Sequence, residues 1–258
     1  MALLSKRPFA DSLLDIRSDD DGVIFQNHIL EPEYHQDVYR LASEQARKSP
    51  GAFQLGDTTK VKRAPNRGRQ PEYVDDEADP DTLKFRGMLD HYGNVVEDSK
   101  TSNICALKSV SIRWGYVDFG VARAVSGDFF EKHKEKCGVK KHDLLINSTG
   151  DGTIGRVAVY NKDHDALVDG HIAIVRFEQP HYAWYAAAYL LSEQGQRQIY
   201  RYINGSSGQV EIYPQDISRL WIPSKAEAAV KDIAQKFQQA VRKYEEFEVE
   251  MTTMLAMA

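Results

Sequence analysis

The sequence predicts an α+β (mixed α/β) domain that carries a long C-terminal α-helix, and three observations predict it. Between residues 104 and 223, short runs rich in β-branched and aromatic residues alternate with turn formers, which is typical of strands. Segments with a helical period of apolar residues stand before and between these runs. From Ser224 to Leu255 the chain has neither proline nor glycine, and its apolar residues keep a heptad spacing. We therefore predict a first domain at 1–223 and a coiled-coil assembly helix at 224–258.

The bulk composition is that of an ordinary soluble globular protein. Apolar residues make up 42% of the 258 residues and charged residues 28%, close to the usual proportions. No window approaches the roughly 18 consecutive apolar residues of a membrane span. The N-terminus lacks the apolar core and cleavage site of a signal peptide, so we expect a cytoplasmic location. Cys105 and Cys137 are too far apart for a CxxC metal clip or redox pair, and we expect no metal.

The first part of the chain holds one clear helical segment. Residues 1–22 are polar and predict irregular structure. Residues 31–48 predict a helix, because Pro32 suits a first turn and Ser49-Pro50-Gly51 ends the run. The residues expected on its apolar face are Tyr34, Val38, Leu41 and Ala42.

Loops and strands follow this helix. Residues 58–82 and 87–103 are rich in charge and turn formers, which predicts loops. Residues 104–121 favour strands, and 128–137 favour a short helix. Trp114 and Tyr116 can make apolar contacts with a ligand, although packing in the core is the role that we expect for them.

The second part of the chain is more regular. Two strands around a polar glycine loop are predicted at 143–147 and 156–160, and a third strand at 171–177. Residues 180–203 predict two helices that are broken near Gly195. After a polar loop, the remaining predictions are a strand at 209–213, a single turn at 214–217 and a short strand at 220–223.

The last segment predicts one helix of about 48 Å, at about 1.5 Å per residue. Its apolar seam extends over about 3.5 heptads. Packing of this helix on its own domain remains an alternative, but its length favours a partner helix. The predicted assembly residues are Val230, Ile233, Phe237, Ala240, Tyr244, Phe247, Met251 and Met254.

The segment Gly150–Gly155 (GDGTIG) matches the GxGxxG pattern of dinucleotide-binding folds. In those folds the third glycine opens a helix whose N-terminus receives the pyrophosphate. Here the glycines lead instead into Arg-Val-Ala-Val-Tyr, which favours a strand. We therefore interpret the motif as a strand–loop–strand connection rather than a nucleotide site.

Other catalytic motifs are missing from the sequence. Ser148 does not lie in a GxSxG elbow, the histidines show no HExxH spacing, and there is no phosphate-binding loop. The Asn/Asp-Pro-Pro-aromatic tetrad of amino-methyltransferases is also absent. Pro80-Asp81 with Lys84 bears a superficial similarity to a nuclease core, but it lacks the strand context. We therefore expect no catalytic residues, and an unrecognised enzyme is the least favoured alternative.

The chain carries a net charge of −5, which argues against a non-specific nucleic-acid binder. Its charges are nevertheless segregated, because residues 58–71 carry five cations and no acid, whereas 72–81 carry six acids. A second basic stretch runs from Lys132 to Lys141. Such segregation permits a positive face on an acidic protein, although two solvated loops would give the same pattern.

Two polar loops offer groups that suit contacts with nucleic acid. The loop at 147–153 supplies hydroxyls, an amide, a carboxylate and backbone N–H groups, with Arg156 just beyond it. The loop at 204–209 has the same chemistry. Such groups contact phosphates and base edges, and glycines allow close approach to a backbone. Simple hairpin turns remain the alternative for both loops.

Several of these segments, taken in order, resemble the specificity subunit of type I restriction-modification systems. The resemblance rests on DLLINSTGDGTIGRVAVY at 143–160, HIAIVRF at 171–177, YLLSEQGQRQIYRYINGSSGQVEIYPQDISRLWIP at 189–223 and the heptad helix. It extends over roughly 13–255, including FQLGD at 53–57, and is most specific over 143–223. Residues 58–142 match only loosely, in the region where such domains vary.

The resemblance implies a DNA target-recognition domain that reads one half of a bipartite target and docks methyltransferase and restriction subunits. It also implies that S-adenosylmethionine and ATP bind the partner subunits, so that this chain holds no cofactor. Arg67 and Arg69 are the candidate guanine readers. The predicted DNA-binding residues are Lys60, Lys62, Arg63, Arg67, Arg69, Asn147, Ser148, Thr149, Asp151, Thr153, Arg156, Ser206, Ser207 and Gln209.

The family's usual subunit has two recognition domains and two helices, whereas this chain has one of each. Two copies can pair through their helices into a two-fold dimer that reads a symmetric target. Alternatively, the partner is a different half-subunit, or the chain is a fragment or a domain that acts with another enzyme. A non-catalytic interaction or inhibitory half-subunit, which docks on a methyltransferase without reading DNA, is the alternative function that the acidic net charge favours.

Overall fold

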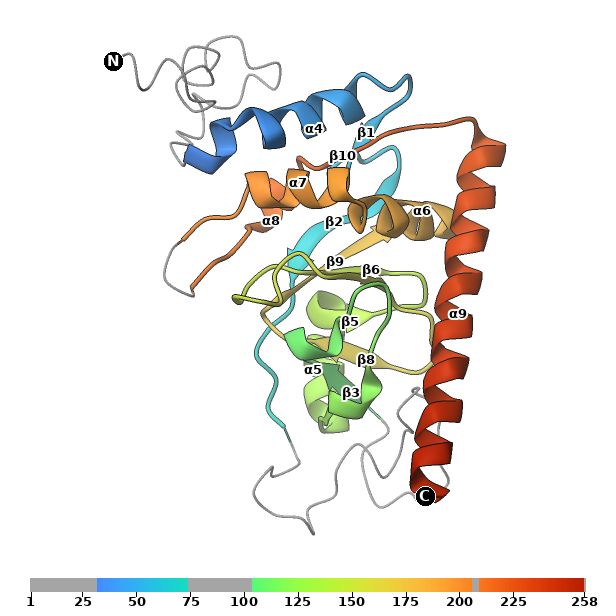
Figure 1. Cartoon of the computed structure of the whole chain (residues 1–258). Coiled ribbons are helices and arrows are strands. Elements are labelled where there is room, and N and C mark those ends of the chain that lie inside the picture. The colour runs from blue at the N-terminus through green and yellow to red at the C-terminus, as the bar shows by residue number, and fades with distance from the viewer. Residues whose placement is uncertain (1–31, 74–103, 206–208, 258) are drawn as a thin grey trace.

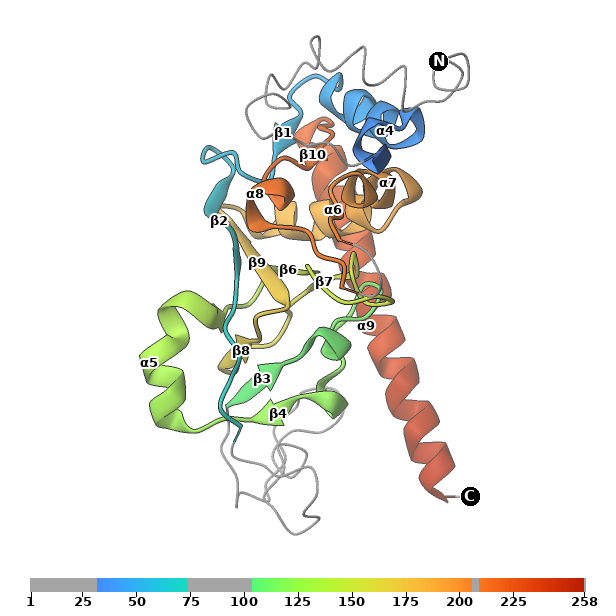
Figure 2. The same ribbon diagram turned by 90° about the vertical axis from the view of Figure 1, so that its left-hand side faces the viewer.

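The structure, a computed structural model, describes residues 32–73, 104–205 and 209–257. Two four-stranded sheets lie at its centre, with helices above, beside and below them (Figures 1 and 2). The first sheet has the order β2-β9-β6-β7 and the second the order β4-β3-β8-β5. The strands are β2 Val61–Arg67, β3 Cys105–Leu107, β4 Arg123–Ala124, β5 Gly138–Val139, β6 Leu144–Asn147, β7 Val157–Val159, β8 Ala166–Val168 and β9 Ile172–Phe177.

In the first sheet, strands β6, β7 and β9 are buried on both faces. In β6, Leu144 and Ile146 pack into the core shared with the helices, whereas Leu145 packs into the core shared with the second sheet. β9 repeats this alternation, with Val175 on the helix side and Ile174 on the other. Side chains of a strand alternate between faces, so burial on both faces explains why these strands are continuously apolar.

Helices surround the sheets. They are η2 Pro32–His35, α4 Asp37–Arg47, η4 Ser109–Ser111, η5 Phe119–Val121, α5 Gly127–Cys137, α6 Pro180–Leu190, α7 Glu193–Arg201, α8 Pro214–Ile217 and α9 Glu227–Met257. A two-stranded ribbon pairs β1 Phe53–Gln54 with β10 Trp221–Ile222. The predicted helices at 31–48 and 128–137, the hairpin strands, the turn at 214–217 and the strand near 220–223 are confirmed. So is the interpretation of the GxGxxG segment as a connection between strands, because β6 pairs antiparallel with β7.

Two details of the predicted helices were wrong. Val38 and Leu41 are 39% and 44% exposed, because α4 packs through Ala42, Ser43 and Ala46. The break between α6 and α7 lies before Ser192, which caps α7 by accepting a hydrogen bond from the Gly195 N–H. Gly195 itself lies within α7, where a Cβ would stand 2.3 Å from the Tyr189 carbonyl oxygen. This glycine therefore permits the close approach of the two helices.

The prediction of a loop over 58–82 was wrong for residues 61–67, which form β2. This strand pairs antiparallel with β9 alone, so it lies at the edge of its sheet. Edge strands tolerate charge and proline because one side of their backbone has no partner strand, and β2 contains both. Its register also shifts twice against β9, on either side of Arg63.

The prediction of a strand over 209–213 was also wrong. Glu211 makes isolated bridges to Asn204 and Thr149, but the segment joins no sheet. The short strands β5 and β8 lie outside the segments that the sequence predicts to be strands. The predictions of irregular structure at 1–22 and of a loop at 87–103 fall outside the described residues.

Helix α9 is confirmed, and its first half packs on its own domain. Val230, Ala234 and Val241 are buried against the core that contains α6, which was the alternative to a partner helix. Phe247 and Met254 are more than half exposed. A straight helix has 3.6 residues per turn, so a heptad stripe drifts by about 20° per heptad around it. The stripe therefore begins against the domain and ends in solvent. Figure 2 shows the C-terminal part of α9 extending away from the sheets.

The division of the chain at residue 223 stays a prediction. In the described part of the chain, no helix is both long enough and apolar enough to cross a membrane.

Candidate nucleic-acid interface

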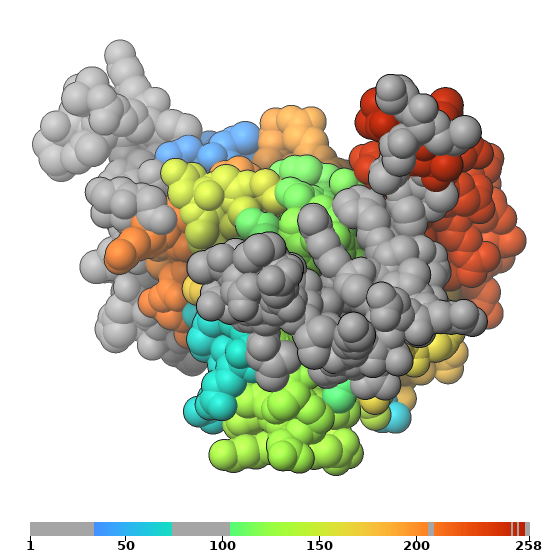
Figure 3. Space-filling view, turned by 90° about the horizontal axis from the view of Figure 1, so that it is seen from below, coloured from blue at the N-terminus to red at the C-terminus, as the bar shows by residue number. Residues whose placement is uncertain are grey.

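The two polar loops predicted as contact sites lie against each other. We call residues 147–156 together with 204, 205 and 209–213 the loop cluster. The Gly150 N–H donates to the Val210 carbonyl at 3.1 Å, and the Ile212 N–H donates to the Ser148 carbonyl at 2.9 Å. Asn204 and Glu211 exchange two backbone hydrogen bonds. Segments about 60 residues apart in sequence thus form one surface, on the side of the molecule away from α9 (Figures 1 and 3).

Arg67, at the end of β2, fastens the loop cluster to the first sheet. Its guanidinium donates to the Glu211 carboxylate at 2.9 Å and to the Ile212 carbonyl at 2.8 Å. A third, longer hydrogen bond of 3.4 Å reaches the Ser148 carbonyl, and the group also lies over the Tyr213 ring. Hydrogen bonds of charged groups are each worth about 1.5–3 kcal/mol. Arg67 therefore holds the shape of the surface and is not a free cation.

The carboxylate of Glu211 links this arrangement to pH. Its hydrogen bond with Tyr213, and then Arg67, hold the pKa of Glu211 below its usual value of 4.5. A depressed pKa stabilises the folded cluster above the unfolded pKa, and this contribution is lost as the pH falls through the folded pKa. We expect the protection factors of the Gly150 and Ile212 amide protons, which compare their exchange with the intrinsic rate at the same pH, to fall below about pH 4.5.

The Glu211→Gln variant should lose this part of the acid dependence in hydrogen-exchange measurements. Glu193→Gln is the matched control, because Glu193 is exposed on α7, lies outside the loop cluster and pairs with Arg197. An identical acid response in wild type and Glu211→Gln would show that Glu211 does not couple the cluster to pH.

Two of the predicted contact residues lie inside the loop cluster. Asn147 and Ser148 are fully buried. The Asn147 amide donates to the carbonyls of Ser109 and Thr153, and the Ser148 hydroxyl donates to the carbonyl of His171. These side chains shape the loop from within.

Other predicted residues lie at the surface of the cluster. Asp151 and Gln209 are exposed, and Thr149, Thr153 and Arg156 are partly exposed. The Thr149 hydroxyl meets Nδ1 of His171, an exposed side chain that the sequence analysis missed because no motif surrounds it. Arg156 donates to the Gly152 carbonyl at 2.7 Å, so it braces the loop while it faces solvent in part. Ser206 and Ser207 lie outside the described residues.

The five cations of 58–71 do not form one patch. Lys60 lies over the Tyr182 ring, at 4.7 Å from its centre, and Lys62 is exposed. Arg63 donates to the carbonyls of Lys136 and Gly138 and therefore caps the C-terminal end of α5. Arg69 is exposed beside the same helix end, where its backbone N–H approaches the Cys137 thiol. Of these five cations, Arg67 is the one that makes side-chain hydrogen bonds to the loop cluster.

A buried ion pair supports the turn that leads into β6. Arg176 makes two hydrogen bonds to the fully buried carboxylate of Asp143, at 2.7 and 2.6 Å. Burial and the neighbouring charge of Arg176 lower the pKa of Arg63. Among the described residues, no group of three or more His, Cys, Asp or Glu side chains is placed to hold a metal ion.

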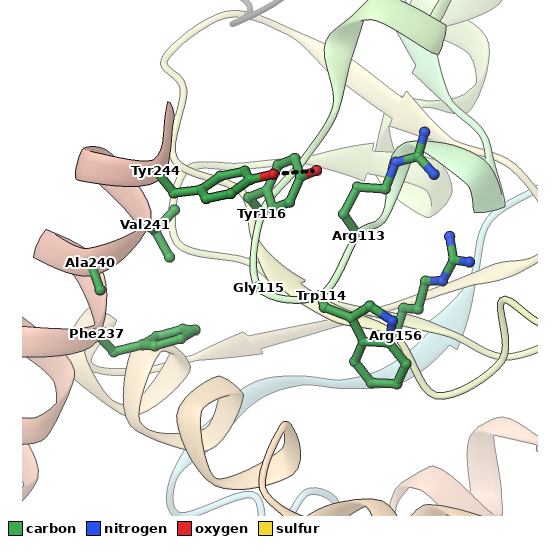
Figure 4. Close-up of a pocket in the computed structure, with 9 residues that line it drawn as sticks. All are labelled: Arg113, Trp114, Gly115, Tyr116, Arg156, Phe237, Ala240, Val241 and Tyr244. Atoms are coloured by element: carbon green, nitrogen blue, oxygen red, sulfur yellow. Dashed lines mark hydrogen bonds between the residues drawn. The ribbon is translucent and has the colours of Figure 1, made fainter. Parts of the chain in front are cut away.

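The expectation that Trp114 packs in the core was wrong. Trp114 is 55% exposed and lines a pocket of about 490 Å³ together with Arg156 of the loop cluster (Figure 4). Tyr116 packs partly against the core, as expected. Residue type alone favours burial of tryptophan, and only the turn around Gly115 brings this one to the surface.

Comparisons with known proteins show the fold. The chain is similar to the structure of the type IIG restriction endonuclease BpuSI, with a TM-score of 0.50, 14% identity, and coverage of 84% of this chain and 30% of that one. A structure from a study of assembly and conformational transition of the type I R-M system gives 0.42, with 13% identity and coverage of 96% and 56%. The HsdS subunit from Thermoanaerobacter tengcongensis gives 0.38, with 11% identity and coverage of 92% and 52%.

The chain therefore spans less than two thirds of each of these three structures. No protein-family model matches the sequence, and no curated protein matches it. At such low identity, the likeness to BpuSI establishes a shared architecture and nothing about residues in common.

Proposed function

We propose that this chain is a non-catalytic subunit that recognises a DNA sequence for a DNA methyltransferase or restriction complex. It reads one half of a bipartite target through the loop cluster. The observation that carries this proposal is the meeting of the two polar loops, which Arg67 fastens to the sheet. Recognition surfaces are commonly loops held by a rigid scaffold, and this one is anchored on a sheet whose strands β6, β7 and β9 are buried.

The chemistry of the exposed groups supports the proposal. Thr149 and Gln209 carry hydroxyl and amide groups that donate and accept hydrogen bonds at base edges. Arg69 and Lys62 are exposed cations on the same strand and its extension, where they can meet phosphates flanking the site. The shared fold with BpuSI, which is described as a restriction endonuclease, agrees with a place in such systems.

The partners follow from the same proposal. The methyltransferase subunit binds S-adenosylmethionine, and a restriction subunit, where present, uses ATP. We further propose that the exposed apolar stripe of α9, formed by Phe247, Met251 and Met254, pairs with another helix. A second copy of this chain is the simplest such partner, because one stripe then covers an identical one around a two-fold axis.

Selection from a randomised duplex library tests the proposal directly. The chain, bound to its methyltransferase subunit, should enrich a short sequence motif at physiological salt. A homodimer should enrich two inverted copies at a fixed spacing, whereas a heterodimer should enrich one copy beside a different half-site. Enrichment without any sequence preference would contradict the proposal and favour an interaction module that does not read DNA.

A further inference from the structure

The pocket beside Trp114 lies between the loop cluster and α9. The turn at 113–116 is held against β7 by a hydrogen bond from the Gly115 N–H to the Val157 carbonyl at 2.9 Å. Across the pocket, Phe237 and Tyr244 of α9 face this turn (Figure 4). Tyr244 stacks at a tilt on Tyr116, with ring centres 4.6 Å apart. Aromatic rings therefore line two sides of the pocket, and the indole of Trp114, which also lines it, is 55% exposed.

The charged groups around the pocket are both cationic. Arg113 and Arg156 line it, and among the described residues no carboxylate does. Arg113 is paired with Asp118 at 3.0 Å behind it, while Nε of Arg156 has no hydrogen-bond partner. Figure 4 shows both guanidinium groups on the side of Trp114 that faces away from α9. A nucleotide combines a flat ring with negative charge and therefore suits these aromatic and cationic groups.

The pocket is also continuous with the proposed DNA surface. Arg156 lines the pocket and at the same time braces the loop cluster through the Gly152 carbonyl. A strand that crosses the loop cluster can therefore place one nucleotide at Trp114 without leaving the protein surface. This continuity favours a base of a bound strand over a free nucleotide and over a side chain of a partner protein.

We infer that this pocket binds one unstacked nucleotide of the DNA that lies on the loop cluster. The base stacks on the indole of Trp114, and its phosphate meets Arg156 and Arg113. Stacking on an aromatic side chain suits any base, so this contact adds affinity for an unpaired nucleotide rather than sequence specificity. The inference rests on the proposed function, since the strand is brought to the pocket by the loop cluster.

Tryptophan fluorescence with three DNA probes tests the inference. The probes are a fully paired duplex, the same duplex with a single bulged nucleotide, and the free nucleotide dAMP. The bulged duplex should quench the emission of the wild-type protein and bind more tightly than the paired one. Trp114→Ala should weaken binding of the bulged duplex about 10-fold or more, and Trp114→Phe should weaken it less while removing the quenching. dAMP at the same nucleotide concentration should give little quenching.

The controls separate this inference from the proposed function. Trp221→Phe, in the β1–β10 ribbon, should keep the quenching, and unchanged thermal unfolding of Trp114→Ala would show an intact fold. Affinity for the paired duplex should change less than about 2-fold in Trp114→Ala, because a paired base cannot stack there. Equal losses for both duplexes, or quenching by the methyltransferase subunit but by no DNA, would overturn the inference. If neither the wild-type protein nor any of its variants binds the paired duplex, the result would count against the proposed function instead.

Discussion

Arg67→Ala should lower the affinity for the DNA target about 30-fold or more, which corresponds to about 2 kcal/mol. The guanidinium makes three hydrogen bonds into the loop cluster, including one to the carboxylate of Glu211. Without it, the carboxylate loses its cation and the loops lose their link to β2. The loops must then be ordered again when DNA binds, at the expense of affinity. Gel-shift titration of the complex measures the loss.

Arg69→Ala is the matched control for this prediction. Arg69 is exposed beside α5, so its removal should cost a few-fold in affinity and reduce the salt dependence by about one phosphate contact. The two variants change the same residue type on the same segment, but only one disturbs the loop cluster. Equal effects of the two variants would show that Arg67 acts as a simple cation. An unchanged affinity in Arg67→Ala would remove the loop cluster from the interface.

Phe247→Asp should convert a self-paired chain into a monomer. Phe247 is 53% exposed in the single chain, and burying such a side chain is worth about 1.5–3 kcal/mol. Pairing can bury only the exposed half of this side chain, and a symmetric dimer contains two copies, so their loss should raise the dimer Kd at least about 10-fold. A charge in the seam adds a desolvation cost to this. Sedimentation velocity over a range of concentrations measures the change.

Gln239→Asp is the control. Gln239 is exposed on another face of α9, and its replacement by aspartate introduces the same charge. It should leave the assembly state unchanged. Phe237→Asp is a poor test, although the heptad pattern alone suggests it. Phe237 contacts Trp184 at a ring distance of 6.1 Å and lies close to Gly115, so its replacement would also destabilise the single chain. If Phe247→Asp sediments as the wild type does, the exposed stripe is not a pairing surface for a second copy.

Much of the secondary structure follows from local sequence. The helices α5 and α9 and the strands β6, β7 and β9 lie where periodicity and residue type predict them. The glycines at 150–155 connect two strands because β-branched residues follow them. In these segments local preference and tertiary packing agree. The charged, proline-containing segment of β2 has no local preference for a strand. It forms one because it pairs with β9 at the edge of the sheet.

The candidate site was predictable in its chemistry and only partly in its arrangement. The sequence indicated both polar loops, but it did not show that Glu211 would pair with Thr149 and Arg67. It grouped five neighbouring cations that lie in different parts of the structure. Side chains alternate between the two faces of β2, and its register shifts twice, so neighbouring cations point in different directions. His171 and Trp114 carried no local signal of exposure at all.

By itself, the sequence determined a mixed α/β chain with a glycine-rich hairpin and a long terminal helix, because these depend on contacts between near neighbours. The tertiary structure alone decided which polar side chains are buried, as with Asn147 and Ser148, and which apolar ones are exposed. It also decided which part of the apolar stripe of α9 packs on the domain and which part faces solvent. A helix has 3.6 residues per turn, so a heptad stripe drifts around it and gradually leaves the side that faces the domain. Long-range packing sets these choices, and segments that are distant in the chain meet only in the folded protein.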